Sequence, residues 1–116
     1  MEKEEDAMQS EPRIAFRNIE PSEAIEDHVR RRIGELEKVF PRIIGCEVVI
    51  EAPQKKKLGG RSFKVHVKVE VPGPDIDVTR TVDYGEASEN VALAVHEAFD
   101  AAGRLLLERK RETSGH

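Results

Sequence analysis

The sequence has few side chains on which nucleic-acid bases could stack. Its 116 residues include no tryptophan, one tyrosine and four phenylalanines. Three of the phenylalanines fall on stripes of apolar residues, where we expect them to be buried. Proteins that read single-stranded RNA usually expose such aromatic rings for stacking. The composition therefore disfavours sequence-specific recognition of bases.

Cysteine and long apolar runs are also scarce. The single cysteine, Cys46, excludes an internal disulfide, which fits a reducing compartment. It falls in an alternating apolar run without a catalytic signature, so we expect a buried structural thiol and not a nucleophile. No run approaches the roughly 18 apolar residues of a membrane helix, and the acidic first residues lack the apolar segment of a secretory signal. We therefore expect a cytoplasmic protein with no membrane partner.

Recognisable catalytic motifs are missing as well. The sequence contains no P-loop, GxGxxG, CxxC or HExxH pattern. The four histidines are scattered along the chain, and the acids Asp75 and Asp77 have no general-acid partner beside them. We therefore predict that the protein is not an enzyme and has neither a metal site nor a cofactor.

Charge is distributed unevenly along the chain. The net charge is -4, from 23 acidic and 19 basic residues. Residues 1–12 hold five of the acids and one base, which leaves 18 of each sign in the remainder. We predict a disordered acidic arm over residues 1–12, a folded domain over residues 13–112 and a flexible tail over residues 113–116. The arm is either a solubilising tail or an autoinhibitory segment that occupies a basic face.

Hydrophobic periodicity predicts six secondary-structure elements. Alternating apolar residues predict strands over residues 13–18, 43–52, 63–71 and 76–82. Apolar residues three and four apart predict helices over 21–40 and over about 89–111, with Ser88 as the N-cap of the second. The order β-α-β-β-β-α predicts an α+β fold. Its four-stranded mixed sheet has a parallel first pair and antiparallel later pairs, and both helices cover one face.

Basic side chains are concentrated in the segment that leads into the third strand. Between Lys55 and Lys68 there are six basic residues and no acid, which suits a polyanion held by its phosphates. Lys38 is a free cation on the outward face of the first helix, and Arg80 lies either at a strand edge or in the site. The basic end of the second helix either contacts phosphate or complements the helix dipole. The candidate RNA-binding residues are Lys38, Lys55, Lys56, Lys57, Arg61, Lys64, Lys68, Arg80, Arg104, Arg109, Lys110 and Arg111.

Several short motifs resemble those of a known family. They are Ile14-Ala15-Phe16-Arg17-Asn18, Pro21-Ser22-Glu23-Ala24, Leu36-Glu37-Lys38-Val39-Phe40-Pro41-Arg42-Ile43, Val71-Pro72-Gly73 and Ala98-Phe99-Asp100-Ala101-Ala102-Gly103-Arg104. Their order and spacing look like the ribosome hibernation promoting factors, which include the ribosome-associated inhibitors and the sigma-54 modulation proteins. The resemblance covers residues 13–112, and the chain is similar to the short form of that family.

The resemblance implies both a fold and a function. The fold would be like that of double-stranded-RNA-binding domains. The partner would be the small ribosomal subunit, bound through ribosomal RNA phosphates in the channel used by mRNA and tRNA. Occupying that channel would inhibit translation and preserve ribosomes in stationary phase or stress. DNA is not an expected partner.

A second hypothesis comes from a different class of protein. The neutral domain, the acidic arm and two leucines off the apolar stripe, Leu93 and Leu107, also fit a protein-interaction module. Such a regulator would keep the fold and lack ribosome binding. The sequence leaves open whether the chain forms a weak homo-oligomer and whether it promotes or blocks ribosome pairing.

Overall fold

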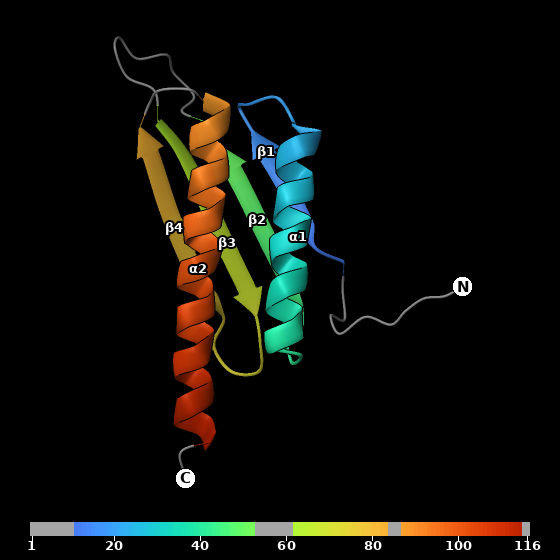
Figure 1. Ribbon diagram of the computed structural model, residues 1–116, viewed down its shortest axis with the longest axis vertical. Coiled ribbons are helices and arrows are strands. Elements are labelled where there is room, and N and C mark those ends of the chain that lie inside the picture. Colours follow the sequence, from blue (N-terminus) through green and yellow to red (C-terminus); the bar gives the residue numbers. More distant parts are fainter. Residues whose placement is uncertain (1–10, 53–61, 84–86, 115–116) are drawn as a thin grey trace, which may run out of the picture.

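One four-stranded sheet carries both helices on the same face (Figure 1). The computed structural model describes residues 11–52, 62–83 and 87–114. The β-α-β-β-β-α order predicted from the sequence is confirmed. The elements are β1 (Arg13–Arg17), α1 (Glu23–Val39), β2 (Gly45–Glu51), β3 (Ser62–Glu70), β4 (Ile76–Asp83) and α2 (Ala87–Ser114).

The sheet has the strand order β1-β2-β3-β4 and the predicted mixture of directions. β1 is parallel to β2, and the other two pairs are antiparallel. The register places Ile14, Val48, Val67 and Val78 in one row across all four strands. Since side chains alternate between the two faces of a strand, this row and its apolar neighbours face the helices. The predicted apolar registers of β2 and β3 are confirmed.

Helix α1 follows the sequence prediction closely. The hydroxyl of Ser22 caps it by accepting a hydrogen bond from the Ile25 N–H at 3.2 Å. Its apolar stripe is buried against the sheet and α2. The helix ends at Val39, two residues before Pro41, because the residue before a proline disfavours the helical region.

Helix α2 is longer than predicted at both ends. It begins at Ala87, so Ser88 lies inside the helix and the prediction of Ser88 as its N-cap is wrong. It continues to Ser114, and residues 113 and 114 therefore belong to the helix and not to a tail. Residues 105–114 contain neither glycine nor proline and are rich in leucine, glutamate, lysine and arginine, which favour helix. In Figure 1 the end of α2 extends past the sheet.

A polar contact joins the two helices above the core. Arg32 of α1 donates a hydrogen bond to Asp100 of α2 at 2.6 Å and also pairs with Glu35 at 3.2 Å. His96 lies 3.3 Å from the other oxygen of Asp100. His28 is half-buried nearby, and its Nε2 atom is buried without a hydrogen-bond partner. Burial, and then the charges of Arg31 and Arg32, hold the pKa of His28 below its ordinary value of 6.5.

This lowered pKa predicts that acid weakens the fold through His28. The folded state favours the neutral ring, so its contribution to stability is complete above about pH 6.5 and is lost as the pH falls below that value. We expect His28→Gln to reduce the loss of unfolding free energy between pH 7.5 and 5.5, as measured by urea denaturation. Arg31→Gln should reduce it partly, because it removes one positive neighbour. An unchanged pH dependence in both variants would contradict this role of His28.

The buried thiol predicts a second outcome. Cys46 is 1% exposed, and its burial raises the pKa of the thiol to about 12. We therefore expect no reaction with a disulfide reagent at pH 8 in the folded protein. One thiol per chain should react promptly in guanidinium chloride. Rapid reaction of the folded protein would show that β2 opens locally or that the thiol is not buried.

Candidate nucleic-acid interface

Those of the predicted cations that the structure describes lie in more than one region of the molecule. Lys55, Lys56, Lys57 and Arg61 lie outside the described residues. The strands that flank them, at the end of β2 and the start of β3, meet at one end of the sheet (Figure 1). Both helices end at the opposite end, beside the turn between β3 and β4. Lys64, near the start of β3, and the ends of the two helices therefore lie at opposite ends of the sheet.

The open face of the sheet carries charges of both signs. Lys64 is exposed and makes no ion pair with another described residue. Lys68 lies 3.8 Å from Asp75, and His66 lies 3.0 Å from Asp77. Local acids therefore offset much of the positive charge that the third strand contributes to this face.

The strand at the other edge of the open face is paired in the same way. Arg13 lies 3.3 Å from Glu70 and 3.9 Å from Glu47. The register also places Glu51 between Arg17 and Lys64. Exposed pairs of this kind contribute little to stability, but each reduces the attraction of the face for phosphate.

Arg80 lies on the side of the sheet that the helices cover. It is opposite Val65 in the register, and its position belongs to the same face as the core residues of β4. Its guanidinium donates a 3.4 Å hydrogen bond to the carbonyl of Thr79. Of the two alternatives from the sequence, the strand edge is confirmed, because β4 is an edge strand. Arg80 and Lys64 therefore cannot contact one flat ligand together.

Within the described part of the chain, five cations lie on the segments where the two helices end. We call this group the helix-end surface, and its members are Lys38, Arg42, Arg109, Lys110 and Arg111. Lys38, Arg42 and Arg111 are exposed and make no ion pair with another residue whose side chain the structure describes. Sequence reasoning missed Arg42. Its position just after the helix and Pro41 was the available signal, since such a connection must pass over the surface.

Two cations of this surface are held by the fold. Arg109 donates a hydrogen bond to the carbonyl oxygen of Pro74, and so joins α2 to the β3–β4 turn. That turn needs a glycine, because Gly73 has a φ of 92°. The ammonium group of Lys110 lies 5.7 Å from the centre of the Phe40 ring, within the range of a cation–π contact. These two side chains thus have structural partners within the fold, in addition to any role in binding.

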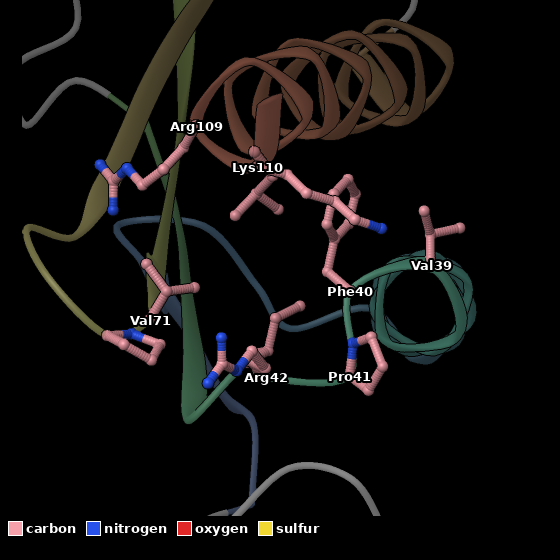
Figure 2. A pocket seen from close by; sticks show the side chains of 10 residues that line it. Val39, Phe40, Pro41, Arg42, Val71, Arg109 and Lys110 are labelled. Atoms are coloured by element: carbon pink, nitrogen blue, oxygen red, sulfur yellow. The ribbon is translucent and has the colours of Figure 1, made fainter. Parts of the chain in front are cut away.

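An apolar pocket of about 450 Å³ opens beside these cations. Figure 2 shows α2 along one side, with Phe40 and Lys110 forming one wall and Val71 opposite them. Arg109 points away toward the β3–β4 turn, and Arg42 lies at the rim. The lining residues are Val39, Phe40, Pro41, Arg42, Ile43, Val71, Pro72, Leu106, Arg109 and Lys110.

Arg104 adds a cation along the outer side of α2. It is exposed, and it precedes Arg111 by seven residues, which places both on one side of the helix. It makes no ion pair with another residue in the described part of the chain. Arg104 and Arg111 thus provide two exposed cations on the same side of α2, in addition to Lys38 and Arg42.

The described residues can bind an anionic partner electrostatically, and they show no group that would hold a metal ion. Within residues 11–52, 62–83 and 87–114, no group of three or more histidine, cysteine or acidic side chains could hold a metal ion. No described helix is long and apolar enough to cross a membrane. The two shifted pKa values, of His28 and Cys46, belong to groups outside the helix-end surface.

A protein-family model matches almost the whole folded part of the chain. The family is described as Sigma 54 modulation protein / S30EA ribosomal protein, and its model matches residues 13–114. No curated protein matches the chain.

Solved structures of similar fold are distant in sequence. A ribosomal subunit interface protein from Coxiella burnetii has a TM-score of 0.57 at 14% identity, and the match covers 83% of this chain and 97% of that one. The N-terminal domain of Protein Y from Thermus thermophilus has a TM-score of 0.53 at 19% identity, with 80% and 94% covered. At these identities the likeness shows a shared fold.

The contact of Arg109 with the turn generates a prediction for stability. Arg109→Gln removes the guanidinium that donates to Pro74, so we expect it to lower the free energy of unfolding by about 1 kcal/mol. Arg111→Gln removes one charge from the same turn of α2, and it should leave stability nearly unchanged. Chemical denaturation of both variants provides the measurement. Equal effects would mean that charge, and not the contact with Pro74, is what matters.

Proposed function

The chain belongs to the Sigma 54 modulation protein / S30EA ribosomal protein family, and we propose that it binds the small ribosomal subunit and inhibits translation. The family predicted from the sequence motifs is thereby confirmed. Members of this family are non-catalytic, which agrees with the prediction that the chain is not an enzyme. The similar structures bear names that describe a ribosomal subunit interface protein and Protein Y.

The helix-end surface is the observation that carries the proposal. Lys38, Arg42 and Arg111 are exposed cations without an ion pair to another described residue. Structured RNA presents closely spaced phosphates, and each phosphate that a cation neutralises releases counterions and adds affinity. Arg104 is a further exposed cation of α2, on the same side of the helix as Arg111. Cations that the fold gathers at one end of the molecule fit a structured RNA that presents its phosphates with a matching spacing.

Inhibition would be steric. The protein would occupy the channel through which mRNA and the anticodon ends of tRNA pass, and its folded body would exclude both. The site would be in the cytoplasm, and the effect would preserve idle ribosomes in stationary phase or stress. No step of this mechanism requires a cofactor or a covalent intermediate.

The other predicted cations would make a second contact. Lys64 faces away from the helices, and Lys55, Lys56, Lys57 and Arg61 precede it in the sequence. They would hold ribosomal RNA at the other end of the sheet, while Lys68 would contribute less because Asp75 lies beside it. Two separated contacts of this kind would favour a large partner with fixed shape over a short flexible strand.

The proposal predicts a charge-dependent loss of binding. We expect Lys38→Gln, Arg42→Gln and Arg111→Gln each to weaken cosedimentation with small ribosomal subunits. Each should also reduce the slope of log affinity against log salt by about 1. Arg30→Gln is the matched control, because Glu26 already pairs with Arg30 at 3.2 Å on the same helix as Lys38. No association at low salt would instead favour the protein-interaction module.

A separate measurement tests the channel. Small subunits loaded with mRNA and initiator tRNA should bind the protein less than empty subunits do, and added protein should prevent loading. Protein that binds loaded and empty subunits equally would retain ribosome binding and refute channel occupancy.

A further inference from the structure

We propose that the apolar pocket of the helix-end surface is a docking site for an acidic peptide segment of a partner protein. The segment would place one large apolar side chain in the pocket and its carboxylates at the basic rim. This inference goes beyond the proposed ribosomal RNA contacts, which use cations alone and do not need the pocket.

The lining of the pocket suits an apolar side chain. Seven of its residues are apolar, and none is a serine, threonine, asparagine, glutamine or acid. A volume of about 450 Å³ lies within the range of about 300–1,000 Å³ that is typical of ligand sites. Ile43 and Leu106 are 2% and 5% exposed, so they form a firm floor that belongs to the core.

Apolar surface continues beyond the pocket. Val39, at its edge, is 54% exposed, and Leu107 of α2 is 41% exposed. Leu107 lies three residues before Lys110, so both are on the side of α2 that approaches Phe40 of α1. Exposed aliphatic side chains beside a formed pocket are typical of an interaction surface.

The positive charge of the rim favours a partner segment with negative charge. Arg42 is exposed at the rim and makes no ion pair with another described residue. Lys38 immediately precedes Val39 and is also exposed. In a segment with acidic side chains on either side of an apolar one, the carboxylates would contact these cations while the apolar side chain is buried in the pocket.

The lining argues against a nucleic-acid base as the occupant. A base carries polar groups on its edges, and burying them without partners is costly. The side chains around the pocket offer only the cationic groups of Arg42, Arg109 and Lys110 as polar partners. A leucine or phenylalanine side chain has no polar atoms to satisfy.

The shape of the pocket argues against a free small molecule. Small-molecule sites usually enclose most of the ligand. Here Val39, Pro41, Arg42, Pro72 and Lys110 are exposed, so the walls are low and much of a small ligand would stay in water. A peptide gains contact area along the rim as well as in the pocket.

The test uses a fluorescein-labelled peptide in which glutamates flank a central leucine and phenylalanine. We expect the full-length protein to bind it by fluorescence anisotropy. Replacing the two apolar residues with serines should weaken binding about tenfold or more, which is the effect of leaving one apolar side chain unburied. Replacing the glutamates with lysines should abolish binding.

Matched variants locate the site. Val39→Glu places an acid at the pocket edge and should weaken peptide binding about tenfold or more. Leu93→Glu makes the same change at a leucine that is 51% exposed and does not line the pocket, so it should have little effect. Both positions are exposed, and circular dichroism should show that both variants fold.

Three results would overturn the assignment. One is equal binding of the leucine–phenylalanine and serine peptides, which would show attraction by charge alone. Another is an RNA oligonucleotide that loses about tenfold in affinity with Val39→Ser, a change that adds no charge, which would assign the pocket to RNA. The third is a shift of the NMR signals of Phe40 and Val71 when residues 1–10 are deleted, which would assign the pocket to the chain's own acidic segment. Cosedimentation of Val39→Glu with small subunits is a separate readout, so failure of peptide binding would not be confused with failure of ribosome binding.

Discussion

The burial of one apolar sheet face is the constraint on which the rest of the structure depends. Val48, Val65 and Val67 are all 0% exposed, and they occupy the middle strands of the sheet. A sheet face made of such side chains is unfavourable in water, so both helices pack on that face. The other face is then left open to solvent with its mixed charges. The direction of each connection also brings the ends of both helices to the same side of the molecule.

Both helices end at the same end of the molecule, so cations there can complement the helix termini and also bind an anionic partner. The last turn of each helix carries partial negative charge from carbonyl groups without an intrahelical partner. Lys38 on α1 and Arg111 on α2 complement that charge. Arg109 and Lys110 lie before the last turn of α2, where they contact Pro74 and Phe40. Lys38 and Arg111 are exposed, so the cations that the helix ends favour are also available to an anionic partner.

The sequence predicted most of the fold because periodicity and turn chemistry are local. The alternating valines of β3 predict a strand by themselves, and Pro41 predicts the end of the helix before it. The candidate site was less predictable because it depends on contacts between distant residues. Arg109 and Pro74, which are in contact at that site, are 35 positions apart in the sequence.

Individual residues also show the difference between what local patterns predict and what contacts between distant residues determine. Sequence patterns could not indicate that Asp75 would approach Lys68. They also could not assemble the pocket, whose walls come from the α1–β2 connection, the end of β3 and α2. The basic loop, which was the strongest charge signal in the sequence, lies outside the described residues.

The length of α2 has a consequence for how the molecule moves. At 1.5 Å per residue its 28 residues extend about 42 Å, whereas the nine residues of β3 extend about 30 Å. Leu106 is the last residue of α2 in the core, and the helix continues for two more turns to Ser114. Amide protons in those turns should exchange with solvent far faster than those beside Val95, because they can open without disturbing the sheet. The protein thus combines a stable sheet and helix core with a final segment of α2 that can change its conformation when it contacts a surface.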